Sequence, residues 1–233
     1  MRFAAIDIET ANADCSSICQ VGVVCFCDGS VAKTWQQLVN PEDDFDPGNV
    51  SIHGITKEAV SHAPAFPEVF GELQALLTGQ IVVCHTAFDR VSLTRASAKY
   101  RLPTVDCTWL DSAKVVRRNW PAHAYRGYSL ANIAQKLGIV FRHHEAQEDA
   151  RAAGEVVLRA IAESGRSLDD WLVRVRQPVS LEAQHRTTVE KARIARDGNP
   201  EGPLAGEVVV FTGALSIPRR EAEEAAAKGT GRA

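Results

Sequence analysis

The chain lacks long apolar runs and a strong charge of either sign. No stretch of its 233 residues approaches the roughly 20 apolar residues that span a bilayer. Asp7 and Glu9 interrupt the only early apolar run, so we expect neither a secretory signal nor a membrane partner, and a cytoplasmic location by default. Because the net charge is −3, any polyanionic partner must be held by local basic patches rather than by a basic body.

The cysteines do not form a zinc knuckle, because no Cys-x-x-Cys pair occurs. In a reducing compartment such residues are more often buried thiols than disulfides. Four of them lie between residues 15 and 27, which keeps a structural zinc site open as an alternative. The six are Cys15, Cys19, Cys25, Cys27, Cys84 and Cys107.

What is present is a succession of strand and helix patterns. The Asp-Gly pair at 28–29 is a hairpin signal, so the second and third strands are predicted to be antiparallel. We also predict that the first two strands pair antiparallel. Strands and helices then alternate, which indicates an α/β domain with a mixed sheet flanked by helices. The predicted strands are 2–9, 18–27, 31–40, 80–85 and 104–107, and the helices begin near 65, 88, 108, 129 and 145.

The pattern changes after Ser164-Gly165. We predict one domain over residues 1–165 and a linker with some helix over 166–203, where Pro and Gly recur without a clean core period. Residues 204–233 read as a strand, a Thr-Gly turn and an Ala/Glu-rich helix.

Asp7 and Glu9 stand one residue apart in the first strand. Positions i and i+2 of a strand share a face, so both carboxylates project together. Like charges so close make ionisation costly unless a cation compensates. An exposed edge strand explains the pattern equally well on these two residues alone.

Further acids follow at the ends of other elements. Asp89 comes just after a buried strand, where open sheets form their sites, although a helix-start acid favoured by the helix dipole is the alternative. His144 and Asp149 would lie about 140° apart on one helix. If they share a site, His144 must precede the helix while Asp149 faces inward. The alternative interpretation, in which Asp149 is a solvated helix acid and His144 an ordinary loop residue, remains open.

Taken in order, Asp-x-Glu-Thr, His-x-x-Phe-Asp and His-x-Ala-x-x-Asp-Ala resemble the motifs of the DEDDh (DnaQ-like) 3′–5′ exonucleases. That family includes the proofreading epsilon subunit of bacterial DNA polymerase III and ribonuclease T. The resemblance covers about residues 1–165 and takes in IHGIT at 52–56 and SLANIAQKLGI at 129–139. It implies a ribonuclease H-like fold and two-metal phosphodiester hydrolysis at the 3′ ends of single-stranded nucleic acid.

The resemblance also implies roles. Asp7, Glu9, Asp89 and Asp149 would hold two divalent cations, Asp7 bridging both and Asp89 serving the second, through water. A site of hard oxygen ligands favours Mg²⁺ or Mn²⁺ over zinc. His144, which titrates near neutral pH, would be the general base, because shifting the motif to His143 breaks the match.

Substrate contacts follow from the same likeness. Thr10 and Phe88 would shape the nucleotide pocket, and Ile55 would be an apolar wedge in the loop that contains His53. Core positions for Phe88 and Ile55 remain open, and His85 is interpreted as structural. Two basic stretches, 117–126 and 174–196, could contact nucleic acid or could be solvated surfaces.

The last 30 residues resemble the opening of a BRCT domain, through Thr212-Gly213 and the Arg219-Arg220 pair. They are too few for a complete module. The prediction is therefore a metal-dependent 3′–5′ exonuclease, acting on DNA more than RNA, with a DNA polymerase or repair proteins as candidate partners. The alternative is a nucleic-acid or phosphopeptide binding protein with a vestigial exonuclease domain.

Overall fold

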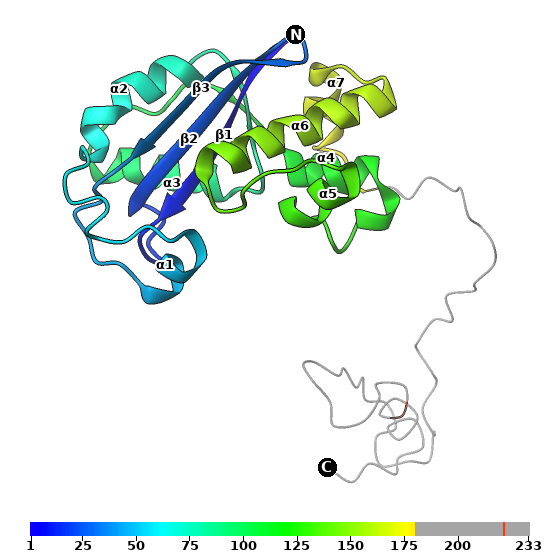
Figure 1. Ribbon diagram of the computed structural model, residues 1–233. Coiled ribbons are helices and arrows are strands. Elements are labelled where there is room, and N and C mark those ends of the chain that lie inside the picture. The colour runs from blue at the N-terminus through cyan, green and yellow to red at the C-terminus, as the bar shows by residue number, and fades with distance from the viewer. Residues whose placement is uncertain (180–220, 222–233) are drawn as a thin grey trace, which may run out of the picture. The chain divides into compact units, whose positions relative to one another are not determined.

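A five-stranded mixed sheet organises the described part of the chain, which in this computed structural model comprises residues 1–179 and residue 221 (Figure 1). The strand order is β3-β2-β1-β4-β5. β1 pairs antiparallel with β2 and parallel with β4, so the predicted mixed sheet and its antiparallel start are confirmed. The strands are β1 (Arg2–Thr10), β2 (Ile18–Cys27), β3 (Ser30–Leu38), β4 (Ile81–Cys84) and β5 (Thr108–Asp111).

Within residues 1–179, seven α-helices and one short 3-10 helix accompany the sheet. Within residues 1–179 and 221, no helix combines the length and the apolar character that crossing a membrane requires. The helices are α1 (Pro47–His53), α2 (Phe66–Leu77), α3 (Phe88–Lys99), α4 (Ser112–Asn119), η1 (Pro121–His123), α5 (Leu130–Leu137), α6 (Ala146–Ser164) and α7 (Leu168–Arg174).

The alternation of β1 assigns its side chains to two different cores. Ala4 and Ile6 join the apolar cluster that α2 and α3 cover. Phe3 and Ala5 point to the opposite face, where α4, α5, α6 and α7 pack. Because side chains two apart share a face, Asp7 and Glu9 continue the face beneath α6, which lies across β1 and β2 in Figure 1. The acids therefore extend a buried face, and the exposed-edge interpretation is wrong.

Several boundaries differ from those predicted, and the helix expected from about residue 108 begins at Ser112. The fifth strand is Thr108–Asp111 rather than 104–107, because Trp109 and Leu110 lie opposite Val82 and Val83 of β4 and bury Leu110 in the core. The compact unit also continues beyond residue 165, since Trp171 of α7 is fully buried in the same cluster as Phe3. The predicted linker beyond residue 179, and all of the BRCT-like segment except residue 221, lie outside the described residues.

Candidate active site

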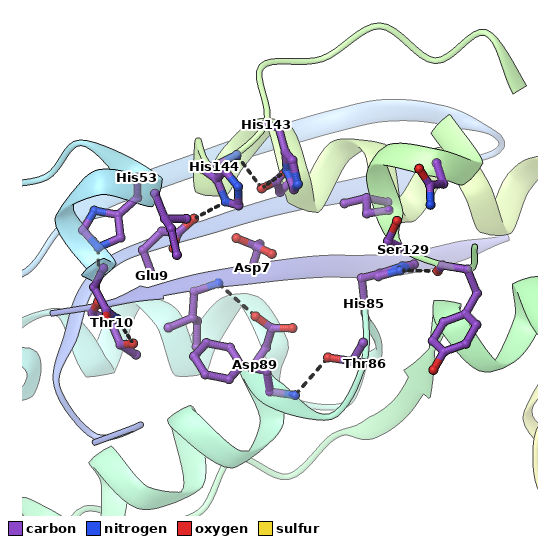
Figure 2. Close-up of a pocket in the computed structure, with 18 of the residues that line it drawn as sticks. Asp7, Glu9, Thr10, His53, His85, Thr86, Asp89, Ser129, His143 and His144 are labelled. Atoms are coloured by element: carbon purple, nitrogen blue, oxygen red, sulfur yellow. Dashed lines mark hydrogen bonds and ion pairs between the residues drawn. The ribbon is translucent and has the colours of Figure 1, made fainter. Parts of the chain in front are cut away.

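A pocket of about 660 Å³ opens where β1 ends, and we call it the carboxylate pocket. It is bounded by the end of β1, by α1, by the β4–α3 turn, by residues 125–130 and by the start of α6. Figure 2 shows Asp7 between Asp89 and the histidine pair of 143–144. The pocket brings together every predicted site residue except Ile55: Asp7, Glu9, Thr10, Phe88, Asp89, His144 and Asp149.

Asp7 and Glu9 both have raised pKa values. Burial raises the pKa of Asp7 well above its ordinary value, and repulsion from Asp89, Asp149 and Glu9 adds to the shift. Burial, helped by the charge of Asp149, raises the pKa of Glu9 to about 7. Both carboxylates therefore need a compensating cation if they are to be ionised together at neutral pH.

Asp89 reaches this group from the first turn of α3. It is buried, and its Oδ1 accepts the backbone N–H of Ile8 at 3.0 Å. Burial raises the pKa of Asp89 to about 8, although the bond from Ile8 acts in the opposite direction. Because Ile8 lies between Asp7 and Glu9 in β1, this bond fixes the third acid beside the first two.

Asp149 enters from the first turn of α6 and is almost fully buried. Its Oδ2 accepts the backbone N–H of His144 at 2.8 Å, and the Nδ1 atom of His143 lies 3.0 Å from its Oδ1. His144 precedes the helix and has a positive φ of 66°, a left-handed conformation. The expected arrangement, with the histidine before the helix and the acid facing inward, is what the structure shows.

Two residues of β2 that the sequence interpretation missed dock the start of α6. Gly22 lies opposite Asp7, and a Cβ there would stand 2.2 Å from the backbone nitrogen of Gln147. The buried Oε1 of Gln20 accepts the backbone N–H of Ala146 at 3.2 Å. The absent side chain of Gly22 thus lets α6 approach the sheet closely enough to bring Asp149 over Asp7. A glycine within an otherwise apolar strand was the available signal.

The two consecutive histidines stack on each other, with ring centroids 3.8 Å apart. The Nδ1 atom of His144 lies 3.8 Å from Glu9 Oε1, whereas His143 contacts Asp149. Burial, followed by the neighbouring His143, lowers the pKa of His144, which favours the neutral imidazole at neutral pH. His144 is therefore suited to accept a proton in the pocket.

The β4–α3 turn is braced from the neighbouring strand. Thr86 has a φ of 83°, and its N–H donates to Asp111 Oδ1 at 3.2 Å. His85 is half-buried and connects two elements, because its Nδ1 lies 2.8 Å from Ser112 Oγ and its Nε2 donates to the carbonyl of Tyr128 at 3.0 Å. His85 thus holds the segment around Tyr128 against the end of β4, a structural role that also shapes the pocket wall.

The residues predicted to contact substrate do not all lie at the pocket. Phe88 is 42% exposed at the pocket, so it is not plain core. Thr10 lines the pocket while remaining buried. Ile55 instead packs in a separate apolar cluster with Ala11 and Val60, which supports the loop-anchor interpretation. Ile52, three residues earlier on α1, is 56% exposed and lines the pocket.

The basic stretch 117–126 is only partly available for binding. Trp120 is buried, and its Nε1 donates to Glu163 Oε2 at 2.8 Å, while Arg117 Nε donates to the carbonyl of Ala124. Tyr125, 65% exposed, and Arg126 remain at the pocket. Most of the second basic stretch, 174–196, lies outside the described residues.

The donor set fits divalent cations. Oxygen atoms of Asp7, Glu9 and Asp149 lie within 4.8 Å of one another. Burial first, and repulsion between neighbouring carboxylates second, raise the pKa of Asp7 and of Glu9. Carboxylate oxygens are the ligands of hard ions such as Mg²⁺ and Mn²⁺. None of the groups of clustered candidate ligands in residues 1–179 includes a cysteine, so the structure lends no support to a cysteine-bound zinc.

Comparison with known proteins identifies relatives that match about two thirds of the chain. The chain is 29% identical over 163 residues to the PolC-type DNA polymerase III of Thermotoga petrophila, a match that covers 68% of this chain and 12% of that protein. It is 24% identical over 166 residues to the 3′-5′ exonuclease DinG of Staphylococcus saprophyticus, covering 68% of this chain and 18% of that one. The match thus spans less than a fifth of either relative.

A solved structure of Exonuclease X in complex with 5′ overhanging duplex DNA has the same fold, with a TM-score of 0.62 at 23% identity. The superposition covers 74% of this chain and 99% of that one. The sequence profile of the exonuclease family (RNase_T) matches residues 4–157, and the BRCT-like segment lies beyond this match. Since the profile covers more than half of the chain, the chain belongs to the exonuclease (RNase_T) family, as its resemblance to the DEDDh exonucleases indicated.

Proposed function

We propose that the chain is a metal-dependent 3′–5′ exonuclease that hydrolyses phosphodiester bonds at nucleic-acid 3′ ends. One observation carries the proposal: four carboxylates from β1, α3 and α6 meet at one pocket with a histidine beside them. Burying three acids with raised pKa values costs stability, and a cation bound by these acids would offset that cost.

Asp7, Glu9, Asp89 and Asp149 would hold two Mg²⁺ or Mn²⁺ ions. When bound, two such ions activate water and stabilise a leaving 3′ oxygen. The hydrogen bond from the backbone N–H of Ile8 to Asp89 Oδ1 holds this ligand oxygen in place before any ion binds.

His144 is the proposed general base. Its lowered pKa keeps the imidazole neutral, which is the form that accepts a proton from an attacking water. Its backbone N–H, bonded to Asp149, fixes the position of the histidine relative to the acid. The stacked ring of His143 restricts the orientation of His144 further.

The pocket wall suits the last nucleotides of a single strand. Phe88 and Ile52 offer exposed apolar surface beside the acids, where the terminal base can pack, and Thr10 shapes the floor. Tyr125 and Arg126 offer a ring and a positive charge farther along the pocket, for the preceding nucleotide and its phosphate. We thus assign to Ile52 the wedge role that the sequence had suggested for Ile55.

We propose DNA rather than RNA as the main substrate. The support is the name of the relative, a DNA polymerase III, which also makes a DNA polymerase or a repair protein the candidate partner. The vestigial-domain alternative requires loss of at least one chemical group, and the complete set of acids with His144 argues against it.

The test uses single-stranded DNA and RNA oligonucleotides of one sequence, each labelled at the 5′ end. We expect a ladder of products shortened from the 3′ end with Mg²⁺ or Mn²⁺, none with EDTA, and faster loss of DNA. Blocking the 3′ end with a phosphorothioate linkage should stop the ladder. Binding without cleavage in every metal condition would support the vestigial-domain alternative instead.

A further inference from the structure

The histidine beside the proposed base orients it but transfers no proton in the proposed reaction. His143 is 42% exposed in its side chain, yet its Nδ1 lies 3.0 and 3.1 Å from the two carboxylate oxygens of Asp149. Its ring stacks on that of His144. One ligand atom from each of His143, His144 and Asp149 falls within a span of 4.8 Å.

This second group of ligand atoms differs chemically from the carboxylates. It offers two imidazole nitrogens and one carboxylate oxygen, a donor set that suits Zn²⁺ and Co²⁺ rather than Mg²⁺. Tetrahedral zinc with bonds of about 2.0–2.2 Å places its ligand atoms roughly 3.3–3.6 Å apart. Here His143 Nδ1 lies 3.0 Å from Asp149 Oδ1, and all three ligand atoms lie within 4.8 Å of one another, so small side-chain rotations would bring them to that spacing.

We propose that His143, His144 and Asp149 form a transition-metal site that takes Zn²⁺, separate in its imidazole ligands from the carboxylate site and sharing Asp149 with it. Zinc bound at His143 Nδ1 would replace the hydrogen bond that this atom now makes with Asp149. The fourth position would be open to water or to Glu9, whose Oε1 lies 3.8 Å from His144 Nδ1.

Occupation of this site has a functional consequence, and this part rests on the proposed function. Zinc held there would engage His144, the proposed base, and Asp149, a proposed ligand of the magnesium site. The two metal states would therefore exclude each other, and micromolar Zn²⁺ would inhibit the exonuclease even when Mg²⁺ is abundant.

The binding test needs no nuclease activity. The full chain is titrated with Zn²⁺ against a chromogenic zinc chelator, as wild type, His143→Ala and His62→Ala. His62 is an exposed histidine that does not line the pocket, which makes it a matched control. All six cysteines are the same in the three proteins, so zinc bound to thiols cancels from the comparison.

We expect the affinity for one zinc equivalent to fall by more than about tenfold in His143→Ala. Even the loss of an outer-shell partner of a metal costs about 10–100-fold in affinity. His62→Ala should match the wild type. Equal zinc affinity in His143→Ala and wild type overturns the site. Circular dichroism of each variant establishes that its fold is retained.

A second measurement on the unmodified protein keeps the site testable if His143→Ala does not fold. Co²⁺ in a four-coordinate nitrogen and oxygen site gives a visible absorption band, which we expect to persist in excess Mg²⁺ and to disappear on adding Zn²⁺. Absence of that band overturns the site.

If zinc binds through His143 but no cleavage occurs with Mg²⁺, the proposed function fails while the zinc site stands. Zinc that binds through His143 without inhibiting an active enzyme contradicts the mutual exclusion.

Discussion

The backbone N–H of Ile8 donates a 3.0 Å hydrogen bond to Asp89 Oδ1, across 81 positions of the sequence. Ile8 stands between the two acids of β1, so this bond places the acid of α3 beside both of them. The same strand lies opposite Gly22, over which α6 brings Asp149. Geometry at the carboxylate pocket therefore depends on how α3 and α6 dock on β1 and β2.

Gly22→Ala should lower activity by moving α6. The added Cβ would collide with the backbone of Ala146 and Gln147, so Asp149 must shift from the other acids. We expect a stability loss of about 1–3 kcal/mol and a fall in kcat. Urea unfolding and steady-state kinetics measure the two effects.

Gly71→Ala is the matched control, because a Cβ at that position of α2 meets no atom within 4 Å. There we expect full activity and a gain of about 0.5–1 kcal/mol, since alanine is the better helix former. An unchanged kcat in Gly22→Ala would show that the approach of α6 is not needed to place Asp149.

His144→Ala should lower kcat by about 10²–10⁴-fold, the usual contribution of a general base, with little change in KM. His143→Ala should have a smaller effect, because His143 reaches Asp149 and not Glu9 in this structure. Single-turnover cleavage with saturating enzyme separates the chemical step from binding. If the larger loss fell on His143→Ala, the base would be the other histidine and the motif alignment would be off by one residue.

Ile52 and Ile55 should respond in opposite ways to truncation. Ile52 is exposed at the pocket, so Ile52→Ala should raise KM while stability stays within about 0.5 kcal/mol. Ile55 is 8% exposed in its own cluster, so Ile55→Ala should cost about 2–5 kcal/mol. Denaturant unfolding and KM on one oligonucleotide distinguish them. A destabilised Ile52→Ala with unchanged KM would return Ile52 to a purely structural role.

Without metal, the protein should lose stability as pH rises from about 4 to 8. Folding raises the pKa of Glu9 to about 7 and of Asp89 to about 8, so in this window the folded state binds more protons than the unfolded state. Stability falls with pH wherever that holds, by roughly 3 kcal/mol at most for Glu9. The measurement is thermal unfolding in EDTA across this range.

Glu9→Gln is the control for this pH effect, because it removes one of the shifted groups and should flatten the dependence. Added Mg²⁺ or Mn²⁺ should raise the Tm more at pH 8 than at pH 5, since ionised carboxylates bind the ion better. Identical pH profiles for wild type and Glu9→Gln would mean that Glu9 ionises without difficulty in the folded protein.

The sequence predicted the chemical groups of the site better than their surroundings. The common face of Asp7 and Glu9 could be predicted from strand alternation, and the family resemblance then joined Asp89 to them. The docking of α6 could not, since it depends on Gly22 lacking a side chain opposite a helix more than 120 residues later.

Ile55 was assigned to the pocket from a motif, but motif position does not determine burial. The αL cap at Gly54 ends α1 and turns the following residue into the cluster formed with Ala11 and Val60. Ile52, inside the short helix, is left facing the pocket. Likewise, nothing local to the two adjacent histidines indicates that one contacts Asp149 and the other approaches Glu9.

The most direct test of this pocket as the active site compares Asp7→Asn with the wild type. The measurement is cleavage of 5′-labelled single-stranded DNA in Mg²⁺. Asp7 stands at the centre of the acid cluster, and an amide cannot replace a carboxylate as a shared ligand. We predict stepwise shortening from the 3′ end by the wild type and none by Asp7→Asn, whose metal-free Tm should hold or rise because the mutation relieves carboxylate repulsion. Wild-type rates in a folded Asp7→Asn protein would contradict the assignment of this pocket as the active site.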